Sequence, residues 1–395
     1  MLLRKLSKKI IDNKKMLIVY ILTILLSIVY VVGFNKLFSR DLNIFQNGND
    51  SIKAKVIEII KTDVNEFHLG MNDVHEEINI YFKAKILSGK NKNKMITAVQ
   101  QINDVYAGQQ EQIKIGKKIL LMEVDYIEDS EYLMVEYLRS DGLILLGVLF
   151  FIFLLLFGKT KGISTIVSLI FTCLSIFLVF IPAILSGESI YLWSIITCLF
   201  IIIMTLLLIN GLTKKTLCSM IGCFSGILIT SILTLIMSKF LNLTGIVDEQ
   251  SYYLQLMDAS NPFDLRAIIF AGIILGAIGA IMDVAVSISA SLLEVYEKSN
   301  DEDKNIKSLM KSGITIGRDM MGTMSNTLVM AYIGSSLSTT ILLLVYSGSL
   351  MELFNKEMII VELLQIIVGS FGLLLTIPLT SLICSFIYCK AKVKI

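Results

Sequence analysis

Charged side chains are scarce in this sequence, and their scarcity excludes most soluble folds. They make up 17% of the 395 residues, whereas soluble domains carry about 25%. Apolar residues make up 55% and the mean hydropathy is +0.75. The apolar residues come in blocks near the roughly 20 residues that span a bilayer. The sequence therefore predicts a polytopic membrane protein, and its net charge of +2 gives no reason to expect a nucleic-acid partner.

The residues and motifs of common catalytic and metal sites are also few. All six cysteines fall within or at the edge of apolar blocks, and no CxxC is present, so no disulfide framework is expected. No GxxxxGK[ST], HExxH or GxSxG motif occurs. The two histidines, His68 and His75, have acidic neighbours, but their spacing fits no standard ligand pattern. We therefore expect no bound metal, no cofactor and no enzyme activity.

The chain begins with a basic stretch and an apolar block, which we interpret as a cytoplasmic N-terminus (1–15) and an uncleaved anchor (16–34). A polar segment follows at 35–140. It contains five short, β-branched runs bounded by turn-like stretches: 51–60, 77–87, 94–102, 117–127 and 131–139. Five such runs predict a small β-barrel, and the OB-fold is a five-stranded barrel of this kind.

Residues 141–395 are predicted to form a seven-helix membrane domain, which makes eight spans with the anchor. The predicted bounds are Gly142–Phe157, Gly162–Leu185, Ile190–Asn210, Leu217–Leu241, Ala267–Leu293, Met320–Tyr346 and Ile359–Tyr388. Short loops rich in Lys and Arg mark the cytoplasmic side, and with eight spans they all fall on the side of the N-terminus. We therefore predict that both termini lie in the cytoplasm and that the β-domain lies outside the cytoplasmic membrane.

Two amphipathic segments flank the sixth predicted span. Residues 249–266 are expected outside, ending at a turn around Pro262. Residues 301–317 are expected inside, where Ile306, Leu309, Met310 and Ile314 recur at helical spacing. This pattern predicts a helix lying along the inner membrane surface before the chain re-enters the bilayer.

The sixth span contains "GAIGAIMDVAVSISAS" (276–291), in which Asp283 stands among apolar and small residues. A charge at the centre of a membrane helix costs roughly 2.5–3.5 kcal/mol on insertion scales. One helical face carries Gly272, Gly276, Asp283 and Ser287, and Gly279 lies nearby. Glycines four apart let another helix approach closely, so we expect Asp283 to face a neighbouring helix or a water-filled cavity.

The seventh span opens with "GRDMMGTMSNTLVMAYIGSS" (317–336), which places Asp319, Gly322, Thr323 and Asn326 on one face. Arg318 precedes them at the cytoplasmic border. The last span adds Glu362 near its outer end. Each polar residue has a structural alternative: an interhelical hydrogen bond for Asp283 and Asn326, an ion pair for Asp319, and an interfacial position for Glu362.

An intramembrane aspartyl protease is a less favoured alternative. Such enzymes pair two aspartates, for which Asp283 and Asp319 are the candidates. The accompanying GxGD motif is missing, since the local sequences are "MDVA" and "GRDM".

These spans resemble the YibE/F-like family of bacterial multi-pass membrane proteins. The resemblance rests on "GAIGAIMDVAVSISASL" (276–292), "SGITIGRDMMGTMSNTLVMAYIG" (312–334) and "ELLQIIVGSFGLLLTIPLTSLI" (362–383). It implies an anchor helix, an external β-domain and a multi-span region. It also picks out Asp283, Arg318, Asp319, Asn326 and Glu362, but it implies no particular reaction.

Two functions remain from the sequence. The first is secondary transport of a small solute or ion, coupled to protons or another cation at Asp283, with Thr323, Asn326 and Asp319 supplying neighbouring oxygens. The second is a membrane scaffold or sensor whose β-domain binds a partner. The expected partners are the lipid bilayer, a small solute or ion, and either a second copy or another membrane protein.

Overall fold

A computed structural model describes residues 2–39, 51–68, 74–89, 91–103, 111–127, 130–257, 263–300 and 304–390. Side chains at 2–15, and those of His68 and His75, lie outside the described part, as does Pro262. The chain forms two compact units, a barrel unit at Asn43–Phe153 and a helical unit at Met1–Leu42 with Leu154–Ile395. The first helix therefore groups with the later helices rather than standing apart.

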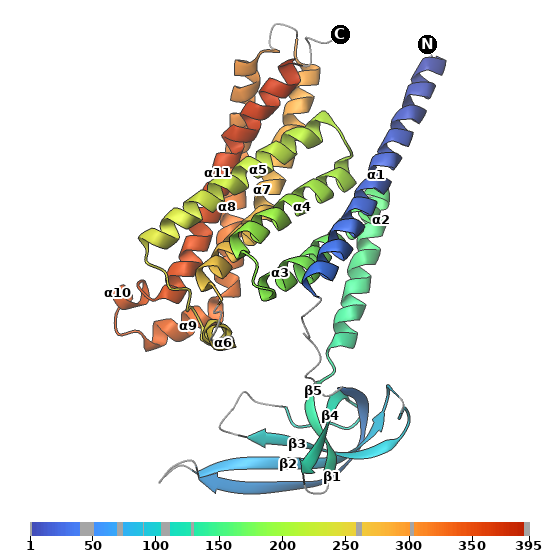
Figure 1. Cartoon of the computed structure of the whole chain (residues 1–395), viewed down its shortest axis with the longest axis vertical. Helices are drawn as coiled ribbons and strands as arrows, with labels where there is room; N and C mark the ends of the chain where they lie inside the picture. Colours follow the sequence, from blue (N-terminus) through green and yellow to red (C-terminus); the bar gives the residue numbers. More distant parts are fainter. Residues whose placement is uncertain are drawn as a thin grey trace. The chain divides into compact units, whose positions relative to one another are not determined.

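The barrel unit contains the five strands that the sequence predicts. They are β1 (Ile52–His68), β2 (Val74–Ile86), β3 (Met95–Asn103), β4 (Lys118–Ile127) and β5 (Ser130–Tyr137). They close into a barrel in the order β1-β2-β3-β5-β4, antiparallel except between β3 and β5 (Figure 1). Alternate residues of β2, such as Ile80, Phe82 and Ala84, fill its core. The predicted small barrel is confirmed.

The helical unit is built from long apolar helices. They are α1 (Leu2–Phe38), the later part of α2 (Ser140–Ser175), the π-helix η2 (Ile176–Phe180), α3 (Ile181–Leu185), α4 (Ile190–Asn210), α5 (Lys214–Phe240), α6 (Glu249–Met257), α7 (Leu265–Lys298), α8 (Ile306–Ser335), α9 (Leu337–Tyr346), α10 (Leu350–Leu353) and α11 (Glu357–Lys390). Within the described residues, six helices are long and apolar enough to cross a membrane, or seven if α8 and α9, bent by 65°, form one span.

One of these six, Ser140–Leu185, is 46 residues long and is broken at Lys159, where φ is 49° and ψ is −124°. A Cβ added at Gly162 would overlap the carbonyl oxygen of Leu154 and lie 3.0 Å from its carbon. In a continuous helix two residues eight apart would be separated by about 12 Å. The chain therefore folds back on itself at Lys159, between the two spans predicted on either side of it.

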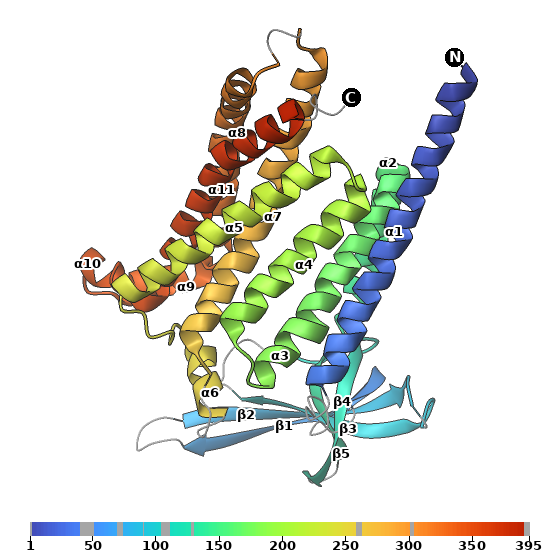
Figure 2. The ribbon, with the colours of Figure 1, turned by 45° about the horizontal axis from the view of Figure 1, so that its top comes forward.

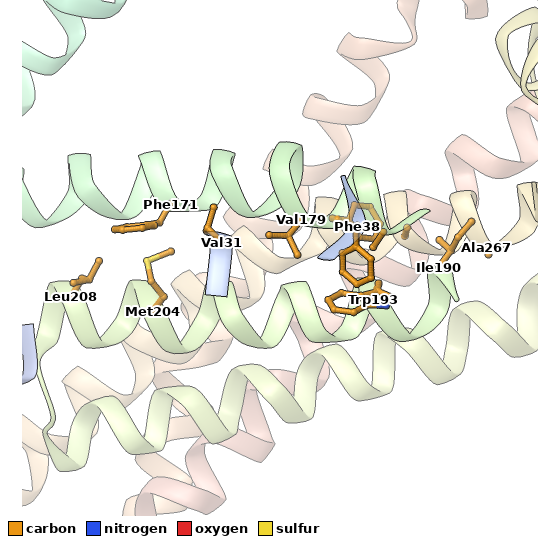
Figure 3. Close-up of a cluster of buried hydrophobic side chains, with 12 residues drawn as sticks. Val31, Phe38, Phe171, Val179, Ile190, Trp193, Met204, Leu208 and Ala267 are labelled. Atoms are coloured by element: carbon orange, nitrogen blue, oxygen red, sulfur yellow. The ribbon is translucent and has the colours of Figure 1, made fainter. Parts of the chain in front are cut away.

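The first helix packs into the helical unit through aromatic side chains. The ring of Tyr30 stacks on Phe200 with centroids 4.0 Å apart, and Phe34 and Phe38 both make T-shaped contacts with Trp193 on α4. Figure 3 shows Phe38 and Trp193 in the buried cluster against which the other three rings pack, with Phe171 of α2 and Met204 of α4 in the same cluster. Aromatic pairs of this geometry add about 0.5–1.5 kcal/mol each beyond their buried area, so α1 is a packed member of the unit.

Helices α5 and α11 run antiparallel with their backbones in close contact. A Cβ at Gly222 would overlap Thr380 Oγ1, one at Gly226 would overlap Thr376 Oγ1, and one at Gly372 would overlap Thr230 Oγ1. The next step of the same series brings Cys218 against Cys384. We name these four contacts the Gly/Thr seam. Small residues at intervals of four permit this approach, and hydroxyl oxygens over glycine Cα atoms suit weak Cα–H···O contacts.

The connections of the helical unit fall into two groups at opposite ends. The start of α1, the α4–α5 and α7–α8 connections and the end of α11 lie at one end (Figures 1 and 2). The α3–α4 connection, α6, α9 and α10 lie at the other. The first group contains the Lys-rich loops and the second contains few basic residues, as the sequence interpretation requires.

The inner amphipathic segment is not the surface helix that its sequence predicts. From Ile306 it is the beginning of α8, which continues without interruption to Ser335. Leu309 is buried, and Cβ atoms added at Gly313 and Gly317 would collide with Ser381 and Ile377 of α11. The apolar stripe therefore packs against protein, because glycines at these positions let α11 come close.

Candidate functional site

Helix α7 is the central element around which the candidate site is built. One face packs on α4 and α5 through residues such as Ile274, Ala277 and Ile281. The adjoining face packs on α8 and α11 through Val284, Ile288 and Leu292. More than half of its most apolar stretch is buried within the protein. These contacts fix the direction in which the remaining face of α7 points.

That remaining face is a stripe of small residues ending in a carboxylate. Gly272, Gly276, Gly279 and Asp283 are exposed, at intervals of four, three and four. A Cβ at Gly272 or Gly279 would meet no atom within 4 Å, whereas one at Gly276 would overlap the Tyr332 hydroxyl of α8. Of the predicted packing glycines on α7, only Gly276 therefore contacts another helix.

Asp283 makes no hydrogen bond or ion pair with any residue that the structure describes. Its side chain is exposed on the surface of the helical unit, and Ser287, one turn further, is half-buried. Asp283 lies 18 residues after the start of α7 and 15 before its end. This position is near the middle of a helix about 50 Å long. The structure thus leaves the carboxylate open at mid-helix.

Helix α8 lies antiparallel to α7, which sets the depth of its polar residues. Gly276 lies against Tyr332, and Leu292 lies against Gly313. Between these two contacts the helices run side by side, so Asp283 of α7 lies at about the same position along the helix axis as Thr323 of α8. The sequence interpretation brings these two residues together, and they do share a depth. No described interaction joins them.

The predicted polar residues of α8 share an exposed face. Arg318, Asp319, Gly322, Thr323 and Asn326 are all exposed. In the described residues neither Arg318 nor Asp319 takes part in an ion pair. The Thr323 hydroxyl donates to the Met320 carbonyl of its own helix at 2.9 Å, and a Cβ at Gly322 would meet nothing within 4 Å. This face therefore contacts no other helix that the structure describes.

A second polar group lies where α8 ends. The Tyr332 hydroxyl and the Gln365 amide meet beside Gly276, and Glu362 interacts with Ser336, at which the chain bends into α9. Glu362 is half-buried. Sequence reasoning missed Tyr332, and only its place in the last turn of an otherwise aliphatic run distinguishes it. Asp283 and the Tyr332–Glu362 group therefore lie at two different positions along the length of α7.

The barrel unit holds a recess of about 690 Å³ that the sequence did not indicate. Gln100 and Tyr137 form its frame: the Gln100 side chain accepts from Ile113 N at 2.8 Å, and the Tyr137 hydroxyl donates to Gln112 O at 3.0 Å. Its charged lining includes two ion pairs, Lys118 with Asp141 and Arg139 with Glu136, together with Glu111 and Lys117. The lining of the recess is therefore largely charged and polar.

No group of three or more His, Cys, Asp or Glu side chains stands ready to hold a metal ion in the described ranges. Whether His68 and His75 bind a metal lies outside those ranges. Two thiols, Cys218 and Cys384, do meet, but they are buried between α5 and α11.

A family model described as YibE/F-like protein matches residues 146–390, which include the whole α7–α8–α11 core. No curated protein and no solved structure matches the chain.

Proposed function

We propose that the chain, which belongs to the YibE/F-like family, is a secondary transporter of a small solute or ion, driven by protons or another cation that binds at Asp283. The observation that supports the proposal is the open position of Asp283. It is a carboxylate at mid-helix, beside glycines, with no hydrogen bond or ion pair to any described residue. A carboxylate that served only to hold helices together would be sealed by direct hydrogen bonds.

In this proposal Asp283 binds and releases the coupling ion. A neutral carboxylic acid costs far less in a membrane than a carboxylate, so a proton can neutralise Asp283 while it faces hydrocarbon. Release follows when the site opens to water. Thr323 lies at the same depth, and Asn326 and Asp319 lie one turn to either side of it on the exposed face of α8. In this proposal they supply neighbouring oxygens and an amide.

The topology that goes with this function has eight spans. The break at Lys159 makes two spans of Ser140–Leu185, and the bent α8–α9 pair makes one. Both termini and the Lys-rich loops are cytoplasmic, and the barrel lies outside the bacterial cell membrane. The closed five-stranded order and the parallel β3–β5 contact support an OB-like assignment of the barrel.

A second candidate function is a scaffold or sensor whose barrel binds a ligand or partner. The charged recess of the barrel unit favours it. The two candidates differ in what they require of Asp283, because the sensor needs no exchangeable ion there. Neither candidate involves enzyme activity, a cofactor or nucleic acid.

The test is flux into proteoliposomes across a panel of ions and small solutes, with an imposed pH or cation gradient. Asp283→Asn keeps the shape of the side chain but cannot release a proton. It should insert normally and lose gradient-driven flux, while Asp283→Glu should keep part of it. The matched control is Glu294→Gln, on the same helix, because Glu294 is exposed and already paired with Lys298 at 2.6 Å.

The control should transport like the parent. If Asp283→Asn also transports like the parent with an unchanged pH profile, ion coupling at Asp283 is wrong. If no member of the panel moves while a ligand binds the barrel recess, the sensor function replaces transport.

A further inference from the structure

We infer that a second copy of this chain covers the exposed polar face of α8, so that the protein is a two-fold symmetric dimer with α8 packed on α8 of its partner. The polar face comprises Arg318, Asp319, Gly322, Thr323 and Asn326. All five are exposed. The opposite face of α8 is already occupied, since Gly313 and Gly317 contact α11 and Leu328 is buried.

Lipid is a poor cover for this face. Arginine and aspartate inside membrane spans almost always pair with one another or face water or protein. In the described helices, neither Arg318 nor Asp319 forms an ion pair with an oppositely charged side chain. Both charges therefore remain available to a partner.

The charges on the face complement those of an identical face. Two copies in one membrane share the same orientation, so their two-fold axis runs along the membrane normal. Arg318 and Asp319 are adjacent in the chain and differ in depth by only about 1.5 Å. A rotation about that axis therefore brings each Arg318 level with the Asp319 of the other copy, and two ion pairs form at once.

The residues that follow fit the same crossing. Gly322 lies one turn beyond, and a Cβ there would meet nothing within 4 Å, so the two backbones can come close at this point. Asn326, one turn further on the same face, carries both a donor and an acceptor. Two asparagines related by the axis can each donate to the other. A self-complementary pattern of this kind favours a second copy over an unrelated protein.

Cysteine cross-linking in native membranes tests the dimer independently of transport. The parent is the full chain with the accessible Cys173 and Cys389 changed to serine. Gly322→Cys and Asn326→Cys should give a disulfide-linked dimer on mild oxidation. Leu228→Cys is the matched control, because Leu228 is exposed on α5 at nearly the depth of Asp283. It should give several-fold less dimer.

Charge exchange tests the reciprocal ion pairs. Arg318→Asp should lower cross-linking of Gly322→Cys, and adding Asp319→Arg should restore it, because the pairs re-form with their signs reversed. Gly322→Leu should prevent two differently tagged copies from co-purifying. It should cause no clash inside the protomer, because an added Cβ at Gly322 meets nothing within 4 Å. Gly147→Leu, at another glycine with open surroundings on α2, should leave them associated.

Several results would overturn the dimer. Equal cross-linking at Leu228→Cys would show random collision. A Gly322→Cys adduct with a different protein would show that another chain covers α8. Full labelling of Gly322→Cys by a hydrophilic maleimide, without dimer formation, would show that water fills the space.

Discussion

The contact between Gly222 and Thr380 gives a prediction whose size follows from the structure. Gly222→Ala places a Cβ on top of Thr380 Oγ1 and 3.1 Å from both its Cβ and its Cγ2. The threonine side chain must then withdraw by about 1 Å to restore ordinary contact distances. It is fully buried, so the helices must separate to let it move, and overpacking of this kind costs about 1–3 kcal/mol.

The same substitution also stabilises the helix, since alanine is more favourable than glycine in a helix interior by about 1 kcal/mol. Gly272→Ala isolates that benefit, because a Cβ there meets nothing within 4 Å. We expect Gly272→Ala to be as stable as the parent or more stable, and Gly222→Ala to be less stable by about 1 kcal/mol. A domain of this size changes its melting midpoint by roughly 2–4 °C per kcal/mol.

The assay is the melting midpoint in detergent, followed by size-exclusion chromatography of heated samples. Thr380→Ala removes the colliding Oγ1 and Cγ2, and the Thr380 hydroxyl has no described hydrogen-bond partner to lose. The double variant should therefore be more stable than the sum of the single effects predicts. Equal midpoints for Gly222→Ala and Gly272→Ala, or strict additivity in the cycle, would refute the close approach of α5 and α11.

Three further predictions concern other parts of the chain. Cysteines at Asn91 and Glu188 should react with an impermeant thiol reagent on intact cells, and labelling only after lysis would reverse the proposed orientation. Glu357→Gln should lower the melting midpoint, because the Glu357 carboxylate accepts from Thr244 N, Thr244 Oγ1 and Gly245 N at 2.6–2.8 Å; an unchanged midpoint contradicts this. Burial, and then the Glu111 carboxylate, raises the pKa of Tyr137 above 10.0. The stability that its neutral phenol contributes is therefore present below pH 10 and is lost as the pH rises through the raised pKa. Urea unfolding of the barrel unit, expressed alone, should show this loss, and Tyr137→Phe should reduce it.

Local patterns in the sequence were sufficient to predict most of the helices and strands. The bounds Ile190–Asn210 agree with α4, because Gly211 with φ of 65° ends that helix where the apolar block ends. The five strands were found from their alternation. The length of β1 was not, because its far end pairs with β2 beyond the predicted run, as far as His68.

Patterns within one helix do not say which partner covers them. The stripe of Ile306, Leu309, Met310 and Ile314 fits a membrane surface and a neighbouring helix equally well, and only the contact of Gly313 and Gly317 with α11 decides between them. The Gly/Thr seam shows the same limit. Its period of four is visible in each helix, but Gly222 and its partner Thr380 are 158 positions apart in the chain.

The candidate site was predicted as a set of residue types, and its spatial grouping was not. Asp283 and Thr323 do reach the same depth because α7 and α8 form an antiparallel pair. The residues do not form one cluster, since the packing of α8 on α11 directs Asp319, Thr323 and Asn326 to an exposed face. An exposed face cannot be inferred from one helix, because helical spacing shows which residues share a face but not what lies opposite.

The two sides of α7 differ in how freely the helices beside them can move. Ile281 of α7 lies next to Gly226 and Gly372 of the Gly/Thr seam. On this side of α7, the helices α5, α7 and α11 are therefore closely packed. Close-packed contacts of this kind resist gradual deformation. On the other side, a Cβ added at Gly272 or Gly279 would meet no described atom within 4 Å, and the chain bends by 65° where α8 ends. In the proposed transport function, we therefore expect a change of access to Asp283 to involve movement of α8 rather than of α5 or α11. If two copies meet through α8, that movement changes both sites together, and blocking it by a Gly322→Cys cross-link should stop flux without lowering the melting midpoint.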